Sequence, residues 1–301
     1  MTKPVLVLGG TGMIGHGVVL ELIAAGIPFR ATTRHEAVVP TGLSDRFTNF
    51  DSSIDILPEL LDGYGRGDVV VNCAGLIKQY IDDLAVDDRV RALESNAALA
   101  LRLALLAREQ GFRVIHITSD CVFAGTRGNY LETDPHDATD VYGQSKSLGE
   151  IATPGILTIR CSVIGPELRG FRSLMHWVLS HNDGAQITGF TNHQWNGVTS
   201  TAFGRVVAGV IRTGNPLSGT VHLVPANSLS KFELVRTILD AFDRTGITLT
   251  PVATENGVDR VLGTAHPDIN ARMWKDAGYA APPTVSEMIA DLARTRTSNG
   301  D

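Results

Sequence analysis

The chain has 301 residues, of which 43% are hydrophobic and 19% charged, and its formal net charge is −6. This length allows one large α/β domain or one domain plus a smaller lobe, and the composition is typical of a well-packed globular protein. The negative charge and the lack of a Lys/Arg cluster argue against nucleic-acid binding. No apolar run approaches the roughly 18 residues that cross a membrane, and no signal peptide is evident, so we expect a cytoplasmic protein without membrane contact.

The first half of the sequence alternates short β-rich runs with helical patterns. The predicted strands cover residues 5–8, 29–33, 69–72, 114–118 and 157–160. The predicted helices cover residues 14–25, 96–110 and 141–152. This alternation is typical of βαβ units with a parallel sheet. We therefore expect an α/β fold with a Rossmann-type, doubly wound parallel sheet in a dinucleotide-binding domain of residues 1–165.

The alternation weakens beyond residue 165, where the domain boundary is soft. Gly, Asn, His and Trp accumulate over residues 182–197, as expected of a loop-rich segment. Further predicted helices cover residues 202–212, 230–243 and 285–294, and a further strand covers residues 220–224. Residues 166–301 are therefore predicted to form mainly a smaller C-terminal α/β substrate-binding lobe, with some segments returning to the first domain.

A glycine-rich run, GGTGMIG at residues 9–15, lies directly between the first predicted strand and the first predicted helix. Glycine permits a tight turn and a close approach of the backbone to a pyrophosphate, whose negative charge the N-terminus of the helix favours. A glycine triplet alone is a weak signal, because ordinary turns also contain such runs. Its position at the first strand–helix junction predicts dinucleotide binding.

Arg34 follows the second predicted strand, where an NAD-binding sequence has an acidic residue roughly 20 positions after the glycines. A guanidinium group suits the 2′-phosphate of NADP, with which it forms two parallel hydrogen bonds. We therefore expect a preference for NADP(H), while use of NAD(H) stays open. The alternative is that Arg34 is a surface residue, and the nearby Glu36 keeps that alternative in play.

Tyr142 and Lys146 are four residues apart and so share one face of a predicted helix. A free phenol has a pKa near 10, and a neighbouring ammonium group is expected to lower it towards the working pH. The predicted strand before this helix ends in Ser119 and Asp120, where a parallel sheet binds its ligands. Ser119 is expected to bind a substrate carbonyl and Asp120 a neighbouring hydroxyl, unless Asp120 only caps a turn.

Five motifs together resemble those of the extended short-chain dehydrogenases/reductases, and most of all the dTDP-4-dehydrorhamnose reductases. They are GGTGMIG at 9–15, NCAG at 72–75, TSDCVFAG at 118–125, ETD at 132–134 and YGQSK at 142–146. The resemblance covers residues 1–165 well and is only general beyond them. It implies reduction of a 4-keto group on a nucleotide-activated 6-deoxy sugar, with NADPH as the hydride donor. Homodimers are common in this family, so a homodimer is one further expectation.

The resemblance also implies the roles of individual residues. It implies a catalytic triad of Ser119, Tyr142 and Lys146. It implies that the dinucleotide is bound by Gly9, Thr11, Gly12, Met13, Ile14, Asp51, Ser52, Cys73, Ala74 and Gly75, by Tyr142 and Lys146, and by Asn96 on the helix that supports the active site. Arg34 joins this set through the argument given above.

The sequence departs from the family pattern after the strand at 157–160. The rhamnose enzymes carry Arg-Thr-Ser-Trp there, with the Trp close to the sugar, whereas this chain has Arg-Cys-Ser-Val at 160–163. The sugar and the nucleotide therefore stay open. The residues expected to bind the substrate are Asp120, Val163, Arg169, Asn192 and Trp195. For Arg169 the alternative is a solvated surface position, and for Trp195 an anchor of its loop to the core. His176, His181 and His193 lack the spacing of metal ligands, so no metal site is expected.

Two other functions remain open from the sequence. A nucleotide-sugar 4-epimerase or dehydrogenase could use the same triad with retained NAD, and it would purify with bound dinucleotide. A non-catalytic, NADP-binding regulatory subunit is the alternative outside the enzymes. The intact Tyr142 and Lys146 pair argues against that alternative, because a sensor need not keep both residues.

Overall fold

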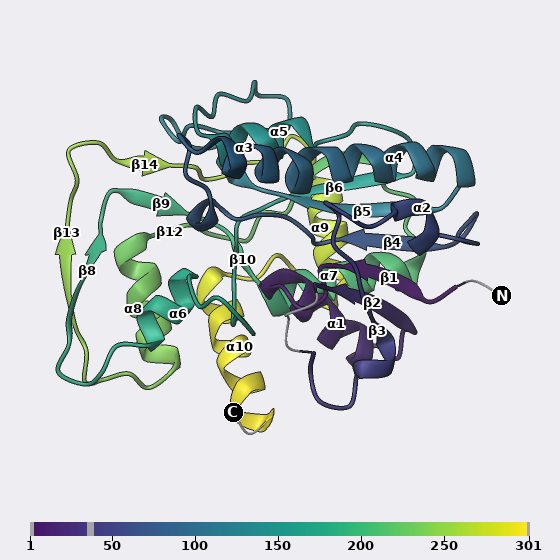
Figure 1. The fold of residues 1–301 in the computed structure, drawn as a ribbon. Helices are drawn as coiled ribbons and strands as arrows, with labels where there is room; N and C mark the ends of the chain where they lie inside the picture. Colours follow the sequence, from purple (N-terminus) through teal and green to yellow (C-terminus); the bar gives the residue numbers. More distant parts are fainter. Residues whose placement is uncertain (1–2, 35–38, 300–301) are drawn as a thin grey trace.

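The computed structural model describes residues 3–34 and 39–299, and its centre is a seven-stranded sheet in which all neighbouring strands are parallel (Figure 1). The strand order is β11-β6-β5-β4-β1-β2-β3. The strands are β1 (Val5–Leu8), β2 (Phe29–Thr33), β3 (Phe47–Asn49), β4 (Val69–Asn72), β5 (Arg113–Thr118), β6 (Ile156–Arg160) and β11 (Gly219–His222). The order reverses between β1 and β4, where sheets of this type bind ligands. The predicted doubly wound α/β fold is confirmed.

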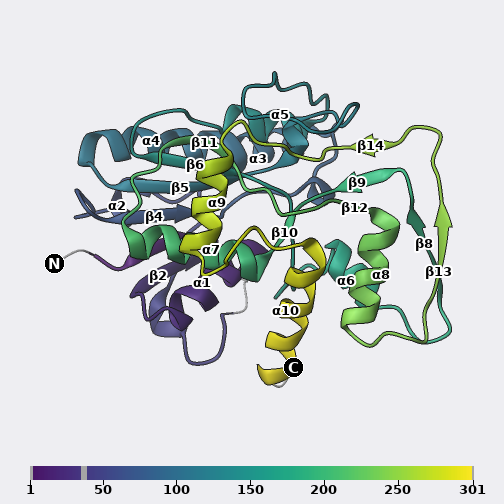
Figure 2. The same ribbon diagram turned by 180° about the vertical axis from the view of Figure 1, so that it is seen from behind.

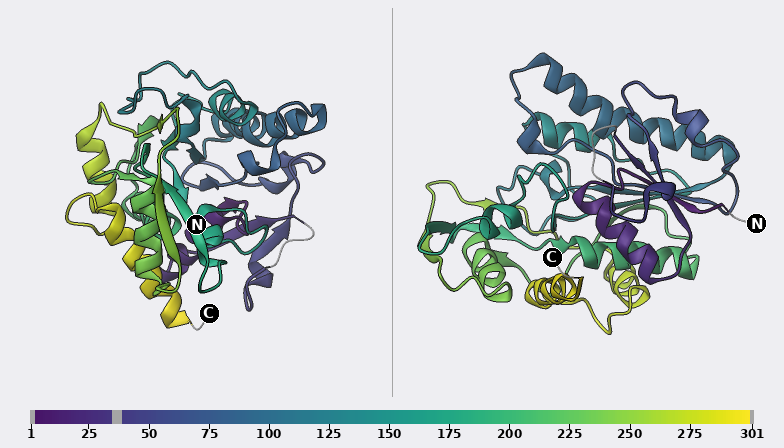
Figure 3. Two further views of the ribbon diagram at one scale, coloured as in Figure 1. Left: turned by 90° about the vertical axis from the view of Figure 1, so that its left-hand side faces the viewer. Right: turned by 60° about the horizontal axis from the view of Figure 1, so that its bottom comes forward.

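Helices cover both faces of the sheet, as the right-hand view of Figure 3 shows. One face carries α1 (Met13–Ala24), α7 (Ser200–Thr213) and α9 (Pro267–Asp276). The other carries α2 (Leu57–Leu60), α3 (Val86–Leu93), α4 (Leu99–Gln110) and α5 (Val141–Leu148). Because both faces are covered, central strands such as β1 are buried along their whole length and read as unbroken apolar runs.

Helices α1 and α7 approach each other at glycines. A Cβ at Gly17 of α1 would lie 2.6 Å from the Ser200 carbonyl oxygen, and one at Gly204 of α7 would lie 2.5 Å from the Gly17 carbonyl oxygen. Both distances are well inside van der Waals contact, so neither position has room for a larger residue. This close contact holds α7, from beyond residue 165, against the helix that follows the glycine-rich loop.

The C-terminal part extends one end of the sheet (Figure 2). It contains the strand pairs β7 (Val163–Ile164) with β10 (Val198–Thr199) and β8 (Gln186–Phe190) with β13 (Thr248–Val252), and the three-stranded sheet of β9 (His193–Trp195), β12 (Leu229–Ser230) and β14 (Val258–Asp259). Its helices are α6 (Leu174–Leu179), α8 (Lys231–Ala241) and α10 (Val285–Asn299). One buried apolar cluster continues from the α1 face of the sheet into α8 and α10.

Two predictions of local structure are wrong. Residues 182–197 contain β8 and β9 rather than a loop, because β8 pairs with β13, which lies about sixty residues further on and leaves no trace in the local pattern. The helix predicted over 141–152 ends at Leu148, and the next residue, Gly149, packs against the backbone of Asn96, whose carbonyl oxygen would lie 2.1 Å from a Cβ at this position. Among the residues described, none of the helices combines the length and apolar character that crossing a bilayer requires.

Candidate active site

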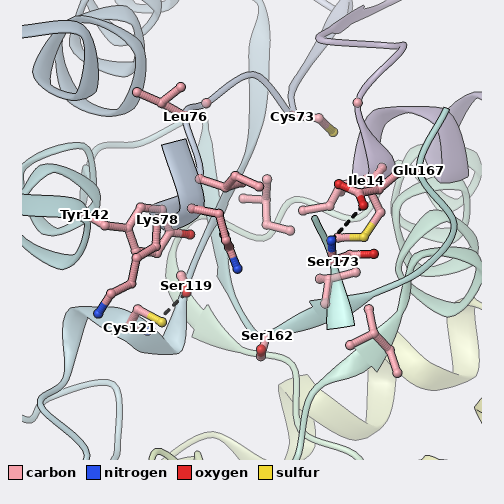
Figure 4. A pocket seen from close by; sticks show the side chains of 18 of the residues that line it. Ile14, Cys73, Leu76, Lys78, Ser119, Cys121, Tyr142, Ser162, Glu167 and Ser173 are labelled. Atoms are coloured by element: carbon pink, nitrogen blue, oxygen red, sulfur yellow. Dashed lines mark hydrogen bonds between the residues drawn. The ribbon is translucent and has the colours of Figure 1, made fainter. Parts of the chain in front are cut away.

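A cavity of about 600 Å³ lies at the carboxyl ends of the central strands, between the sheet and the C-terminal lobe. Its walls combine the glycine-rich loop, the segments after β4 and β5, helix α5 and the chain that follows β6. Figure 4 shows Ser119, Cys121 and Tyr142 on one side and Ile14, Glu167 and Ser173 on the other. The backbone N–H of Ser173 donates to Glu167 over 2.7 Å and so closes the loop on that second side.

The glycine-rich loop has the shape that a pyrophosphate requires. Gly9 has φ +75°, and a Cβ there would lie 3.0 Å from the backbone of Ala74. A Cβ at Gly15 would lie 2.2 Å from the Gly9 carbonyl oxygen. Helix α1 starts after Gly12 with neither a side-chain cap nor an acidic residue in its first turn, so its first N–H groups are free for an anion. Thr11, Gly12, Met13 and Ile14 all line the cavity.

Arg34 also lines the cavity, at the end of β2. Beside it, the hydroxyls of Thr11 and Thr33 are 3.0 Å apart, which ties the glycine-rich loop to this strand end. Glu36 lies outside the described residues. Arg34 therefore lies beside the glycine-rich loop, at the place expected for the 2′-phosphate of a dinucleotide held by that loop.

The other residues expected at the dinucleotide divide into two groups. Cys73 and Gly75 line the cavity, whereas Ala74 lies behind the loop and packs against Gly9. Asp51 and Ser52, in the turn after β3, do not line the cavity, and Asp51 accepts hydrogen bonds from Ser53. The roles of Asp51 and Ser52 stay predictions.

Ser119, Tyr142 and Lys146 come together in the cavity wall. Asp140 caps α5 by accepting from the Gly143 N–H over 2.7 Å, and this sets the start of the helix that carries Tyr142 and Lys146. A Cβ at Gly143 would lie 2.3 Å from the Cys121 carbonyl oxygen, so the helix packs directly against the end of β5. Local capping and a glycine contact thus place the phenol beside Ser119.

Burial dominates the electrostatics of this group. It raises the pKa of the Tyr142 phenol well above its usual value, and a hydrogen bond with Ser119 opposes that rise. Burial also lowers the pKa of the Lys146 ammonium to about 8. The rise at Tyr142 is opposite to the direction expected from the Tyr142–Lys146 spacing, because burial and the negative charges of Asp120 and Asp140 all raise the pKa of the phenol.

Asn96 does not line the cavity but fixes its back wall. It lies in a π-helical turn, Glu94–Ala98, that joins α3 to α4. The helix predicted from residue 96 begins within this turn. Its amide accepts from the Leu76 N–H over 2.8 Å, donates to the Leu76 carbonyl over 3.0 Å and donates to the Ser145 hydroxyl over 3.0 Å. A Cβ at Gly75 would lie 2.9 Å from the Lys146 ammonium nitrogen, so Gly75 leaves the space that Lys146 occupies.

Arg160, only 1% exposed, forms the centre of a buried polar network at the end of β6. Its guanidinium group makes two hydrogen bonds to the Glu150 carboxylate, one of them 2.9 Å long. It also donates to Nε2 of His222 over 2.6 Å and to Nε2 of His136 over 2.7 Å. Nδ1 of His222 donates to the Gly263 carbonyl over 2.6 Å, so this imidazole is neutral. The network holds the strand that leads directly into the cavity wall at Cys161.

The buried imidazole of His222 predicts a pH dependence of stability. Burial lowers its pKa from 6.5 to about 4. The unfolded chain therefore binds the proton more readily, and stability falls as the pH is lowered from 6.5 towards 4, by about 3 kcal/mol for this group. Urea unfolding at pH 7 and pH 5 should show a smaller loss in His222→Asn than in the natural chain. The exposed His266→Asn is the control, and an equal loss in all three proteins would contradict the prediction.

The residues expected to bind the substrate are only partly brought together. Asp120, Val163, Arg169 and Trp195 line the cavity. Asn192 does not, because its amide is bound to the Thr254 backbone through bonds of 2.7 and 3.2 Å in the turn between β8 and β9. The role of Asn192 in substrate binding stays a prediction. Several further lining residues were not singled out from the sequence: Leu76, Lys78, Tyr80, Ser162, Glu167 and Lys231.

Comparison with known proteins gives consistent matches along the whole chain. The RmlD substrate binding domain family matches residues 2–297. A dTDP-4-keto-6-deoxy-D-glucose reductase of Streptomyces niveus is 25% identical over 92% of each chain. The beta subunit of methionine adenosyltransferase 2 of Bos taurus is 26% identical over 83% of this chain and 75% of the relative.

A solved structure has the same fold. The dTDP-4-dehydrorhamnose reductase of Bacillus anthracis, determined in complex with NADP, superposes with a TM-score of 0.72 at 18% identity and covers 98% of this chain and 100% of its own. The parallel sheet, the glycine-rich loop and the Tyr142–Lys146 helix agree with the family match. The chain belongs to the RmlD substrate binding domain family, within the extended short-chain dehydrogenases/reductases.

Proposed function

We propose that this protein is an NADPH-dependent reductase of a 4-keto group on a nucleotide-activated 6-deoxy sugar. The observation that carries the proposal is that the glycine-rich loop and the group of Ser119, Tyr142 and Lys146 line one cavity. A phosphate-binding loop and a proton donor on the same cavity are what a dinucleotide-dependent carbonyl reduction requires. The dTDP-keto-sugar reductase from Streptomyces supports the choice of substrate class.

In this reaction the cofactor supplies the hydride, and the protein supplies binding and proton transfer. Residues 1–165 hold most of the dinucleotide, and residues 166–301 hold mainly the sugar. The Ser119 hydroxyl, which donates to Asp120 in the structure, rotates to donate to the carbonyl oxygen of the bound substrate, on which negative charge develops. Tyr142 then gives its phenolic proton to that oxygen. Lys146, buried and cationic below a pKa of about 8, stabilises the phenolate and binds the ribose of the nicotinamide nucleotide.

Arg34→Ala is expected to weaken the preference for NADPH. Removing a guanidinium group from a phosphate loses a charge-assisted hydrogen-bond pair, so kcat/KM for NADPH should fall roughly 10- to 100-fold. The value for NADH, which has no 2′-phosphate, should change little. Initial rates with both cofactors in the natural chain and the variant measure this directly. Equal effects on the two cofactors would place Arg34 at the surface.

The proposed function is tested by following NADPH oxidation at 340 nm with freshly prepared dTDP-, GDP-, UDP- and CDP-4-keto-6-deoxy sugars. Turnover of one of them supports the reductase and identifies the nucleotide. Protein that purifies with bound dinucleotide and isomerises a nucleotide sugar without net NADPH consumption would instead be an epimerase.

The similarity to a methionine adenosyltransferase beta subunit shows that a chain of this kind can be a subunit of another enzyme. A non-catalytic, NADP-binding regulatory subunit is therefore the alternative to the reductase. Tight NADPH binding without turnover of any keto sugar supports that alternative. The intact Tyr142 and Lys146 pair, together with Ser119 in the same wall, favours the reductase.

A further inference from the structure

Lys231 reaches the cavity from the C-terminal lobe. It is the first residue of α8, directly after the cap Ser230, whose hydroxyl accepts from the Glu233 N–H over 3.1 Å. Its side chain lines the same cavity as Ser119 and Tyr142. The ammonium nitrogen lies 5.2 Å from the centre of the Trp195 ring. Lys231 therefore adds a positive charge to the wall contributed by the C-terminal lobe.

The position of this ammonium group is unfavourable in several ways. The N-terminus of a helix repels a cation. Burial lowers the pKa of Lys231, while the charge of Asp120 opposes that effect. Within residues 3–34 and 39–299, no carboxylate forms an ion pair with Lys231 at 4.0 Å or less. A charge held in such surroundings on a cavity wall is a candidate for ligand binding.

Trp195 offers little surface on which a sugar could stack. Its side chain is buried, with the residue only 4% exposed, and its indole N–H donates to the Ser162 hydroxyl over 2.8 Å. A Cβ at Gly197 would lie 2.2 Å from the ring, so the backbone packs directly against it. Lys231 lies over the ring. What this wall presents to a ligand is therefore the ammonium group rather than the aromatic face.

Asp120 provides a complementary acceptor beside the reacting group. Its carboxylate accepts from the Ser119 hydroxyl over 2.9 Å, and both residues line the cavity. A carboxylate and an ammonium group that both reach one ligand suit a hydroxyl, which donates to the first and accepts from the second. The negative charge of Asp120 disfavours a carboxylated sugar at the same place.

We propose that Lys231 is a specificity-determining residue that, together with Asp120, binds the sugar hydroxyl on the carbon next to the carbonyl. This inference rests on the proposed reduction of a 4-keto sugar, in which that hydroxyl is the one at C3. Lys231 selects 3-hydroxy over 3-deoxy substrates, and Trp195 holds the lysine in position instead of stacking on the sugar.

The kinetic test compares Lys231→Met with the natural chain on a 4-keto-6-deoxy sugar and its 3-deoxy analogue. Loss of a hydrogen bond from a charged donor should lower kcat/KM for the 3-hydroxy sugar roughly 10- to 100-fold and leave the KM for NADPH unchanged. The effect on the 3-deoxy analogue should be much smaller. Arg236→Met is the matched control, because Arg236 lies over Phe232 on the same helix, outside the cavity. An equal loss with both sugars would overturn the proposal.

A binding measurement separates this proposal from the proposed reaction. Calorimetry on NADP-loaded protein compares each nucleoside diphosphate with its hydroxylated 6-deoxy sugar conjugate, for example dTDP with dTDP-rhamnose. A gain in affinity from the sugar that Lys231→Met loses supports the contact, even if no keto sugar is turned over. A gain that the variant keeps, or no gain with any nucleotide, overturns it.

Discussion

Tyr142→Phe is expected to lower kcat by about 10²- to 10⁴-fold while the Kd for NADPH stays within a fewfold of the natural value. The phenol is the proposed proton donor, and burial raises its pKa, so it is fully protonated at neutral pH. Phenylalanine fills the same space without the proton. Stopped-flow measurement of NADPH oxidation and fluorescence titration of NADPH give the two quantities separately.

The matched control for this variant is Tyr64→Phe. Tyr64 is 8% exposed and donates to the Pro4 carbonyl over 3.1 Å, so it also loses a hydroxyl from a mostly buried phenol. It does not line the cavity. Thermal unfolding of both variants shows whether the fold is kept. Unchanged turnover in Tyr142→Phe would refute the proposed chemistry, and weaker NADPH binding alone would make Tyr142 a cofactor-binding residue.

The sequence predicts those parts of the structure that depend on neighbouring residues. The glycine-rich loop and the Tyr142–Lys146 pair each consist of residues that are close together in the sequence, so their spacing is enough to predict their local structure. Central strands such as Val5–Leu8 are apolar throughout because they are covered on both faces. These signals are sufficient for the doubly wound fold, and they identify several of the residues that line the cavity, such as Thr11, Tyr142 and Lys146.

The lobe was harder to predict because its elements depend on distant partners. The strand Gln186–Phe190 alternates exposed and buried residues and is completed by a strand beginning at Thr248. Asn192 looked available for a ligand, yet Thr254 already binds its amide. Lys231 gave one local signal, a cation directly after a helix cap. Its relation to Trp195 and Asp120 becomes visible only when three separate elements meet.

The buried pair of Arg160 and Glu150 also joins separate parts of the chain, and its loss is expected to have a large effect on stability. Their side chains are 1% and 7% exposed, and two hydrogen bonds join them. Glu150→Gln leaves the Arg160 guanidinium group buried without its counter-charge, so the free energy of unfolding should fall by about 3–5 kcal/mol. Asp88→Asn, which breaks the exposed Asp88–Arg91 pair, should change it far less. Urea unfolding at pH 7 measures both.

A double variant, Glu150→Leu with Arg160→Met, distinguishes the two ways in which the pair could act. Because removing two charges from water is itself unfavourable, the double variant, with apolar residues at both positions, should have a higher free energy of unfolding than Glu150→Gln. Its effect on turnover then reports on position, since Cys161 and Ser162, which follow Arg160, line the cavity. If stability recovers but kcat/KM for the sugar stays low, the network positions the cavity wall that faces the substrate. If stability and kcat/KM both recover, Arg160 contributes only to stability. A double variant less stable than Glu150→Gln would contradict the view that the unpaired buried charge causes the loss of stability. The hydrogen bonds from Arg160 to His136 and His222 would then be its main contribution to stability.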